Sequence, residues 1–432
     1  MKVGFITLGC KVNIYESNAL KEEFQRRGFE VLDAEDDCDI YVINTCSVTN
    51  MADSKSRKMI RRCIKMNPNA IICAIGCYVQ TNDDAKEIEG VDILVGNGNK
   101  ASIVDKVVDL VNRGVKEKNI DILDILNISE YEALGVTTYD HTRAFVKIED
   151  GCNQFCAYCI IPFARGNVRC KDSDSVIEEL KNITEKGYKE VVLAGIHTGR
   201  YKDKKKNVNL SRLVRRILNE VPKLKRLRLS SIEINEIDDD FIQMMKESEI
   251  LANHLHLPLQ AGSNKTLKNM GRPYDLNYFK EKIDKIRSVR PDISISTDII
   301  VGFPYETDED FTETMEFSKE IGFSKIHVFP YSKRKGTRAA EMPQVNDKVK
   351  KDRALELIAL SDKLEEEYSK KFVGQKLDII VEQKYSKDKM IGHSSNFLQI
   401  VLDLDENMIK KQVDVVVDKV ENKMVFGHII KN

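Results

Sequence analysis

The sequence contains no tryptophan, only 9 prolines and no long run of apolar residues. Without such a run there is no candidate transmembrane helix, and residues 1–10 lack a signal-peptide cleavage site and are interpreted as a first strand. Lysine plus arginine (68) balance aspartate plus glutamate (69), so overall charge does not favour a general nucleic-acid binder. We therefore expect a cytoplasmic globular protein with no membrane partner. At roughly 150 residues per domain, its length predicts two or three domains.

Positive charge is nevertheless concentrated in three segments. Residues 54–66 contain six basic residues and no acidic one, and residues 200–228 contain twelve basic residues and two acidic ones. The third segment holds Lys333, Arg334, Lys335 and Arg338. One such segment is typical of a solvated helix face. Three in a neutral chain favour a polyanionic partner.

The expected fold class is α/β, with three parts. Alternating strand and helix patterns over 1–112 predict an N-terminal doubly wound parallel-sheet domain, and the polar segment 113–142 reads as a linker. Renewed alternation over 143–346 predicts a partial (β/α)6 barrel, followed by a connecting helix at 347–371. Short β runs over 372–432 predict a small antiparallel β-barrel. The expected strands are 3–8, 40–44, 70–75, 91–95, 145–148, 190–194, 226–230, 254–259, 293–300, 325–329, 377–381, 398–402, 413–420 and 424–430, and the expected helices are 14–27, 51–66, 82–89, 100–112, 173–186, 209–220, 275–289 and 307–320.

Cys152, Cys156 and Cys159 form a C-x3-C-x2-C cluster directly after a predicted strand. A structural zinc site normally has four protein ligands, and no fourth one lies at a suitable local spacing; Cys170 is the nearest candidate. An iron–sulfur cluster held by three cysteines keeps one iron open for a substrate. We therefore favour an iron–sulfur site, with a zinc loop closed by a distant ligand as the alternative.

A second set, Cys10, Cys46 and Cys77, follows three predicted strands of the first domain. The carboxyl ends of parallel strands meet at one crevice, so these thiols are expected to converge. Cys73 lies inside an apolar strand and is interpreted as a buried core residue. The pair His254 and His256 is interpreted as packed, not catalytic.

These residues resemble those of a known family. The cluster with Tyr158 before its last cysteine is similar to the radical S-adenosylmethionine (SAM) signature, and the segments 143–152 and 160–166 resemble the methylthiotransferases. Residues 7–17, Thr-Leu-Gly-Cys-Lys-Val-Asn-Ile-Tyr-Glu-Ser, resemble the branch of this family that acts on threonylcarbamoyladenosine, as does the segment 327–334. Two departures are Tyr305, where the family commonly has glycine, and Arg338, where proline is frequent.

The resemblance implies cofactors and partners. Two [4Fe–4S] clusters would be held by the two cysteine sets, and SAM would serve as methyl donor and radical source. Implied partners are tRNA, through its anticodon loop, and an electron donor such as a flavodoxin or ferredoxin; the chain would act as a monomer with a TRAM-like C-terminal domain that binds RNA. The implied metal ligands are Cys10, Cys46, Cys77, Cys152, Cys156 and Cys159, and the implied SAM contacts are Tyr158, Gly195, Ser230, Glu233, Gln260 and Asp298.

The implied reaction is methylthiolation of C2 of N6-threonylcarbamoyladenosine at position 37 of tRNA. No side chain can deprotonate such a carbon at neutral pH, so a radical from a cofactor is required. One alternative is the same chemistry on isopentenyladenosine in tRNA or on a ribosomal protein. The residues after Cys10 argue against both of these substrates. The other is a non-catalytic RNA-binding protein with iron–sulfur or zinc sites.

Overall fold

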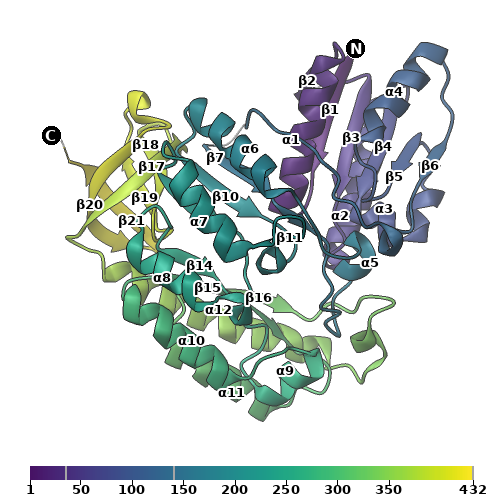
Figure 1. The fold of residues 1–432 in the computed structure, drawn as a ribbon. Coiled ribbons are helices and arrows are strands. Elements are labelled where there is room, and N and C mark those ends of the chain that lie inside the picture. The colour runs from purple at the N-terminus through teal and green to yellow at the C-terminus, as the bar shows by residue number, and fades with distance from the viewer. Residues whose placement is uncertain (35–36, 140–141, 431–432) are drawn as a thin grey trace.

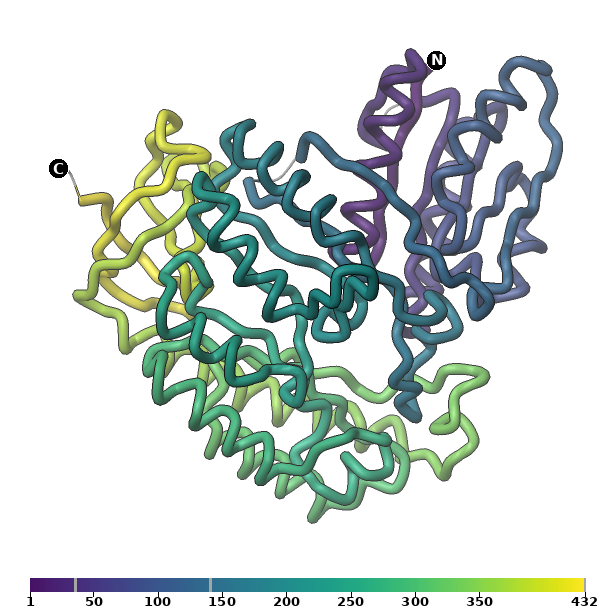
Figure 2. The backbone as a smooth tube through the Cα atoms, in the orientation of Figure 1, coloured from purple at the N-terminus to yellow at the C-terminus, as the bar shows by residue number. Residues whose placement is uncertain are grey.

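The computed structural model describes residues 1–34, 37–139 and 142–430 (Figure 1). Residues 140–141 of the expected linker and 431–432 of the expected C-terminal domain lie outside the described residues. The N-terminal sheet and the C-terminal barrel lie on opposite sides of a central arc of strands and helices, as the tube in Figure 2 also shows. Within the described ranges, no helix has both the length and the apolar character needed to cross a membrane.

The N-terminal sheet has six parallel strands in the order β2-β1-β3-β4-β5-β6. The four inner strands are the four predicted ones, and β3 and β4 are buried along their whole length. The two edge strands are not among the predicted ones, because most of their residues are exposed or half-buried and form no apolar run. The bounds are β1 Lys2–Thr7, β2 Glu30–Asp33, β3 Ile40–Thr45, β4 Ile71–Gly76, β5 Ile93–Val95 and β6 Asn119–Asp121.

Helices cover both faces of this sheet, as the expected doubly wound arrangement requires. The core on one face includes side chains of α1 and α4, and the core on the other includes side chains of α2 and α3. The helix predicted at 82–89 is instead a short 3₁₀ turn, and β6 lies within the predicted linker, so the linker begins later than expected. The bounds are α1 Lys11–Arg26, α2 Asn50–Met66, α3 Cys77–Thr81, η1 Asp83–Glu87, α4 Ser102–Arg113 and η2 Ile125–Asn127.

The central part contains six parallel strands in two sheets, β13-β10-β7 and β14-β15-β16. Parallel bridges from Leu227 to Leu251 and from Ser231 to His256 join the sheets into one arc. The six strands are those predicted, which confirms the partial barrel. Their bounds are β7 Arg143–Lys147, β10 Glu190–Ala194, β13 Arg226–Leu229, β14 His254–His256, β15 Ser294–Val301 and β16 Lys325–Pro330.

Apart from α5, which packs against α3 of the N-terminal domain, the helices of the central part lie on the outside of the arc (Figure 1). One continuous hydrophobic core fills the space between these helices and the strands. The bounds are α5 Ile161–Arg165, α6 Ser173–Glu185, α7 Leu210–Glu220, α8 Asp239–Glu247, α9 Asn264–Met270, α10 Leu276–Val289, α11 Asp308–Ile321 and α12 Asp347–Lys370, with short strands β8 Glu149–Asp150, β9 Arg169–Cys170, β11 Lys202–Asp203 and β12 Val208–Asn209 and 3₁₀ turns η3 Thr198–Arg200, η4 Ile234–Glu236 and η5 Arg338–Glu341.

The C-terminal strands close into a five-stranded barrel in the order β17-β18-β19-β21-β20. All its pairs are antiparallel except β19 with β21, which is parallel. The strand β18 is not among the predicted ones because lysine, glycine, histidine and serine interrupt its apolar pattern. The bounds are β17 Lys376–Lys384, β18 Lys389–Ser394, β19 Gln399–Asp403, η6 Glu406–Met408, β20 Gln412–Glu421 and β21 Met424–Ile429.

Candidate active site

Cys152, Cys156 and Cys159 lie on the loop between β8 and α5. The Cys152 amide donates a hydrogen bond to the Gly166 carbonyl (2.9 Å), which closes the base of the loop. The three thiols interact electrostatically with one another, so they lie close together. Burial raises the pKa of the Cys159 thiol to about 12. A nearby metal centre would therefore be needed to hold it as a thiolate at neutral pH.

The second set comes together where three neighbouring strands of the N-terminal sheet end. Cys10 precedes α1, Cys46 follows β3 and Cys77 begins α3. A Cβ atom on Gly9, whose φ is +97°, would lie 2.9 Å from the Cys46 sulfur, so this close approach requires glycine. Burial raises the pKa of Cys46 to about 11, and the neighbouring Cys77 and Cys10 add to the shift.

The spacing of the sulfur atoms distinguishes a single zinc ion from a cluster. With zinc–sulfur bonds of about 2.3 Å, tetrahedral ligand atoms lie about 3.8 Å apart. Among the described residues, only His256, Asp298 and His327 place three ligand atoms within 4.8 Å of one another. Within the described residues, neither cysteine set brings its three sulfur atoms together as a ready site for a single ion.

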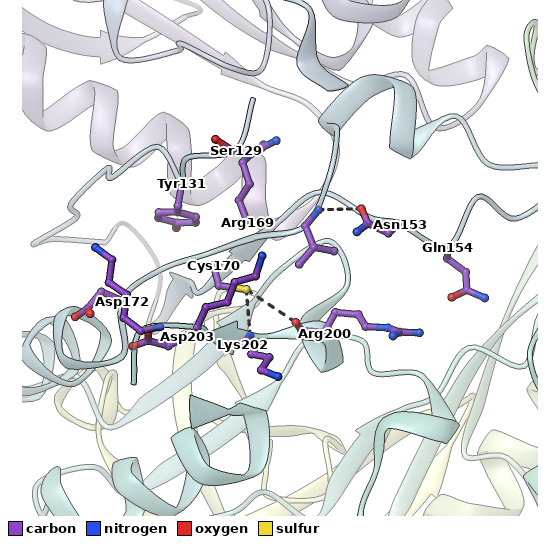
Figure 3. A pocket seen from close by; sticks show the side chains of 13 residues that line it. Ser129, Tyr131, Asn153, Gln154, Arg169, Cys170, Asp172, Arg200, Lys202 and Asp203 are labelled. Atoms are coloured by element: carbon purple, nitrogen blue, oxygen red, sulfur yellow. Dashed lines mark hydrogen bonds between the residues drawn. The ribbon is translucent and has the colours of Figure 1, made fainter. Parts of the chain in front are cut away.

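Cys170, the candidate fourth zinc ligand, has other partners. Its sulfur accepts a hydrogen bond from the Lys202 amide (3.2 Å) and lies 3.9 Å from the Arg200 carbonyl. It lines a separate cavity of about 590 Å³, together with several basic side chains (Figure 3). The structure therefore gives no support to a zinc loop closed by Cys170.

Two buried side chains contact the sulfurs of the Cys152 loop. Nδ1 of His197 lies 3.3 Å from Sγ of Cys152, and Nη1 of Arg272 donates to Sγ of Cys156 at 3.3 Å. Arg272 also forms an ion pair with Glu233, one of the implied SAM contacts. Burial raises the pKa of the Cys156 thiol, and the Arg272 guanidinium opposes this rise by favouring the thiolate.

A buried group of charges connects the two cysteine sets. Glu16 pairs with Lys100, with Lys147 (2.7 Å) and with Arg165 (2.7 Å), and the last two also reach Asp150 (2.7 and 3.2 Å). Burial opposes ionisation of Glu16, but the three cations outweigh it and hold its pKa well below the usual range. Glu16 belongs to α1, which follows Cys10, and Arg165 belongs to α5, which follows the Cys152 loop, so this network ties the two cysteine sets together.

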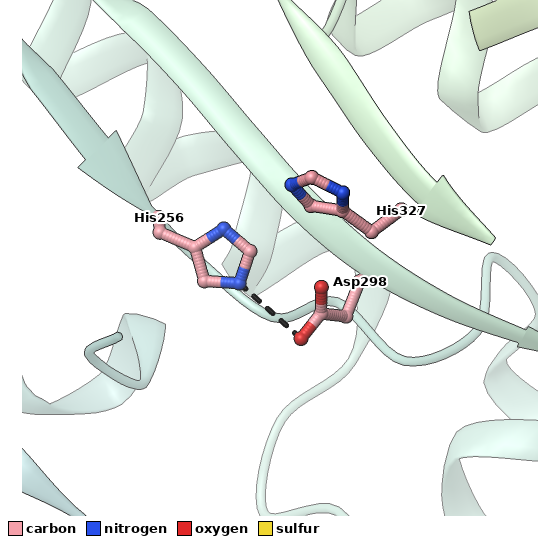
Figure 4. Close-up of side chains that lie close together, drawn as sticks. All are labelled: His256, Asp298 and His327. Carbon is pink, nitrogen blue, oxygen red and sulfur yellow. Dashed lines mark ion pairs between the residues drawn. The ribbon is translucent and has the colours of Figure 1, made fainter. Parts of the chain in front are cut away.

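A cavity of about 900 Å³ lies between the central strands and the C-terminal barrel. Ser230 and Asp298, two of the implied SAM contacts, line it, and so does Lys11 of the N-terminal domain. Oδ2 of Asp298 lies 3.2 Å from Nε2 of His256, and His327 completes the trio in Figure 4. All three parts of the chain thus contribute to one cavity.

The other implied contacts lie outside the lining of this cavity. The Gln260 amide donates to the Asp298 carbonyl at 2.8 Å, which fixes one strand end against the next. A Cβ on Gly195 would lie 2.8 Å from Oε2 of Glu149, so this strand end has no room for a side chain. The four contacts outside the lining are Tyr158, Gly195, Glu233 and Gln260. Tyr158 is half-buried and packs edge-on against Phe303, with the ring centroids 6.3 Å apart.

Sequence reasoning includes His197 only within the strand-end segment 194–197 and Lys11 only within the segment 7–17 that carries the resemblance, and it does not single out Arg272. His197 lies two residues after Gly195 and Lys11 one residue after Cys10, so proximity in sequence was an available signal for both. Arg272 follows α9, and no spacing in the sequence connects it with the Cys152 loop. Only the folded chain brings its guanidinium to Cys156.

Comparison with known proteins identifies the family. Residues 146–318 match the family described as the Radical SAM superfamily, and residues 2–96 match "Uncharacterized protein family UPF0004". The chain is 43% identical to a threonylcarbamoyladenosine tRNA methylthiotransferase MtaB from Bacillus subtilis (96% of this chain, 93% of that protein). It is 38% identical to the protein of that name from Aquifex aeolicus (88% and 93%).

Similarity extends to a second group of relatives and to solved structures. The chain is 33% identical to a tRNA-2-methylthio-N(6)-dimethylallyladenosine synthase from Thermoanaerobacter (98% of this chain, 92% of that protein). The solved radical SAM methyltransferase TsrM from Kitasatospora setae superposes with a TM-score of 0.55 at 14% identity (78% and 75% of the chains), a likeness of fold alone. By its identity to these relatives over nearly its whole length, the chain belongs to the radical SAM tRNA methylthiotransferases, in the MtaB-type branch.

Proposed function

We propose that this protein replaces the hydrogen at C2 of N6-threonylcarbamoyladenosine, at position 37 of tRNA, with a methylthio group. The observation that carries the proposal is the pair of cysteine sets, which come from two parts of the chain and are tied together by the buried Glu16 network. Gly9 and Lys11, on either side of Cys10, line the large central cavity, so Cys10 lies beside its wall.

Each cysteine set would hold one cluster. Cys152, Cys156 and Cys159 would hold the [4Fe–4S] cluster that binds SAM, and the auxiliary cluster would be held by Cys10, Cys46 and Cys77. When bound, these groups supply the methyl group, the sulfur and the radical that an unactivated C–H bond requires. The chain itself supplies the six thiolates, and Arg272 adds a positive charge at Cys156.

We assign the binding of SAM to the ends of the central strands. Ser230 and Asp298 would face it from the cavity, while Tyr158, Gly195, Glu233 and Gln260 would shape the space beside the Cys152 loop. In the structure Ser230 is hydrogen-bonded to Thr198 (3.0 Å between their hydroxyl oxygens) and Glu233 is paired with Arg272. Polar groups at the carboxyl ends of barrel strands are the usual position for ligand contacts.

The proposed tRNA surface combines a basic helix with the C-terminal barrel. Lys55, Lys58 and Arg61 of α2 are exposed and form no ion pair among the residues that the structure describes. Phosphate groups would compensate these charges. The barrel lines the cavity with its β18–β19 loop, including the half-exposed Phe397. An electron donor such as a flavodoxin or ferredoxin would reduce the clusters, with the chain acting as a monomer.

Cysteine variants test the assignment of the two clusters. After anaerobic reconstitution, we expect about eight irons in the wild type and about four in Cys152→Ala and in Cys46→Ala, since each variant loses one [4Fe–4S] centre. Cys152→Ala also abolishes SAM cleavage to 5′-deoxyadenosine, whereas Cys46→Ala retains cleavage and loses methylthiolation. Cys73→Ala, in the buried strand β4, is the matched control and keeps both clusters. Full iron content in Cys46→Ala would contradict the assignment.

A further inference from the structure

The central cavity contains five lysine and arginine side chains, and four of them are already neutralised. Arg143 pairs with Glu382 (3.1 Å) and Arg228 with Glu190 (2.7 Å). Lys325 pairs with Glu365 and Lys423 with Asp362 (2.6 Å). For Lys11, the fifth, the described part of the chain provides no ion pair and no side-chain hydrogen bond. Its ammonium is therefore the uncompensated positive charge of this cavity.

The surroundings of Lys11 add to this positive character. Its electrostatic neighbours are the cations Arg143 and Arg228 and, of opposite sign, the Cys10 thiol and the Asp298 carboxylate, of which Cys10 belongs to a cysteine set and Asp298 is paired with His256. Lys11 is exposed to the cavity, and a lysine beside two arginines attracts an anion that reduces the repulsion among the three cations. The cavity is thus suited to a ligand that brings a carboxylate or a similar anion to the Lys11 end.

The position of Lys11 relates that anion to the reacting carbon. Lys11 directly follows Cys10, so it lies at the edge of the cavity nearest the proposed auxiliary cluster. In adenine, C2 and the N6 substituent lie on the same edge of the base, on either side of N1. A base that presents C2 to the set of Cys10, Cys46 and Cys77 therefore also directs its N6 substituent towards the same wall of the cavity.

We propose that Lys11 binds the carboxylate of the threonyl group of the substrate and is the residue that selects a threonylcarbamoyl over an apolar N6 substituent. This inference rests on the proposed function. A prenyl group in the same place would leave the Lys11 ammonium desolvated and unpaired. Sites built around a buried polar partner reject analogues that lack it far more strongly than hydrophobic sites do. Lys11 would therefore be a specificity residue; it takes no part in the chemistry.

The test compares Lys11→Gln and Lys11→Arg with the wild type on two substrates. One is tRNA that carries N6-threonylcarbamoyladenosine, and the other is the same tRNA with the threonyl carboxylate converted to its methyl ester. We expect the wild type to lose roughly 30- to 1000-fold in kcat/KM on the ester, mainly through KM, because a desolvated charge pair is broken. Lys11→Gln should handle acid and ester alike, and Lys11→Arg should largely restore the preference.

Two controls separate this inference from its alternatives. Lys423→Gln removes a cation of the same cavity that already has a carboxylate partner, so it should keep the preference for the acid. Iron content and 5′-deoxyadenosine formation show whether Lys11→Gln leaves both clusters intact. Equilibrium dialysis with the free nucleoside and its ester gives a second readout that does not depend on turnover, and there too only Lys11→Gln should lose the preference.

The outcomes are distinct. A wild type that methylthiolates the threonylcarbamoyl tRNA but accepts acid and ester equally overturns the role of Lys11 and leaves the proposed function standing. A Lys11→Gln variant that still prefers the acid to the ester also overturns the proposed role of Lys11. A wild type that forms 5′-deoxyadenosine and never modifies this tRNA overturns the proposed function itself.

Discussion

Glu149 and Glu190 are both buried carboxylates, but their neighbours differ. Burial raises the pKa of Glu149 to about 8, although the amides of Ile196 and His197 donate hydrogen bonds to it (2.9 and 2.7 Å). Burial acts on Glu190 too, but Arg228, Arg226 and Arg143 outweigh it and lower the pKa of Glu190. The two groups should therefore affect stability with opposite dependences on pH.

The raised pKa of Glu149 predicts a stabilising substitution. The folded protein resists ionisation of this group, so its contribution to stability is complete below about pH 4.5 and is lost as the pH rises through 8. Glu149→Gln stays neutral, so its free energy of unfolding relative to wild type should rise by about 3–5 kcal/mol between pH 4.5 and 8. Denaturant titrations at these two pH values measure the difference. A variant that is no more stable relative to wild type at pH 8 than at pH 4.5 would contradict the assignment.

Glu190→Gln should behave in the opposite way. The wild-type contribution is present at neutral pH and disappears as the pH falls below the ordinary value of about 4. At pH 7 the variant leaves the buried Arg228 without a carboxylate and Arg226 with Asp378 as its remaining one, which should cost about 3–5 kcal/mol. The same denaturant titrations, extended to pH 3.5, should show that the difference in free energy of unfolding between wild type and variant becomes smaller. A deficit that is constant with pH would show that the pair contributes through packing alone.

Tyr305 occupies a backbone conformation that suits glycine. Its φ is +67°, and its side chain is 51% exposed, so little packing compensates the strain. Tyr305→Val should lower the free energy of unfolding by about 1–2 kcal/mol, because β-branched residues tolerate this region least. Tyr385, equally exposed at 53% and without a positive φ, is the control, where valine should change stability by less than about 0.5 kcal/mol. Equal effects at the two positions would refute the strain argument.

At the scale of elements, the basic helix α2 should contribute electrostatic affinity for tRNA. Replacing Lys55, Lys58 and Arg61 with glutamine should weaken tRNA binding and reduce the slope of log K against log salt by about 2 to 3. Filter binding at several salt concentrations measures both quantities. The control variant replaces Lys348, Lys351 and Lys363, exposed lysines of α12 outside the basic segments. A slope unchanged by the α2 substitutions would place the tRNA elsewhere.

The elements that the sequence predicts well are those with a strong apolar pattern. Strands β3, β4, β10 and β15 are buried almost throughout; β3 and β4 end directly before Cys46 and Cys77, and β15 contains Asp298. Edge strands β2 and β6 and the barrel strand β18 lack such a pattern, because one side of an edge strand or small barrel is solvated. Their positions depend on tertiary pairing.

Long-range ion pairs are the part of the site that spacing cannot predict. Glu16 meets Lys100, Lys147 and Arg165 across separations of 84, 131 and 149 residues. Each of these residues looks like an ordinary surface charge in the sequence, and only the docking of the N-terminal sheet on the central arc buries them together. The same holds for the contact between Arg272 and Cys156, at a separation of 116 residues.

At the scale of the whole molecule, the central arc holds the other two parts in fixed positions. The Glu16 network fastens the N-terminal sheet to it, and Arg228 fastens the barrel by donating to the carbonyls of Ser394 (2.5 Å) and Ser395 (2.8 Å). The cavity between them is lined by all three parts.

The central claim is most directly tested by the product of the reaction. The reconstituted protein is incubated anaerobically with SAM, dithionite and tRNA carrying N6-threonylcarbamoyladenosine, and the digested nucleosides are analysed by mass spectrometry, with Cys10→Ala and Cys152→Ala as controls. The account predicts that the wild type alone adds one methylthio group to the modified adenosine. Formation of 5′-deoxyadenosine with the nucleoside unchanged would contradict it.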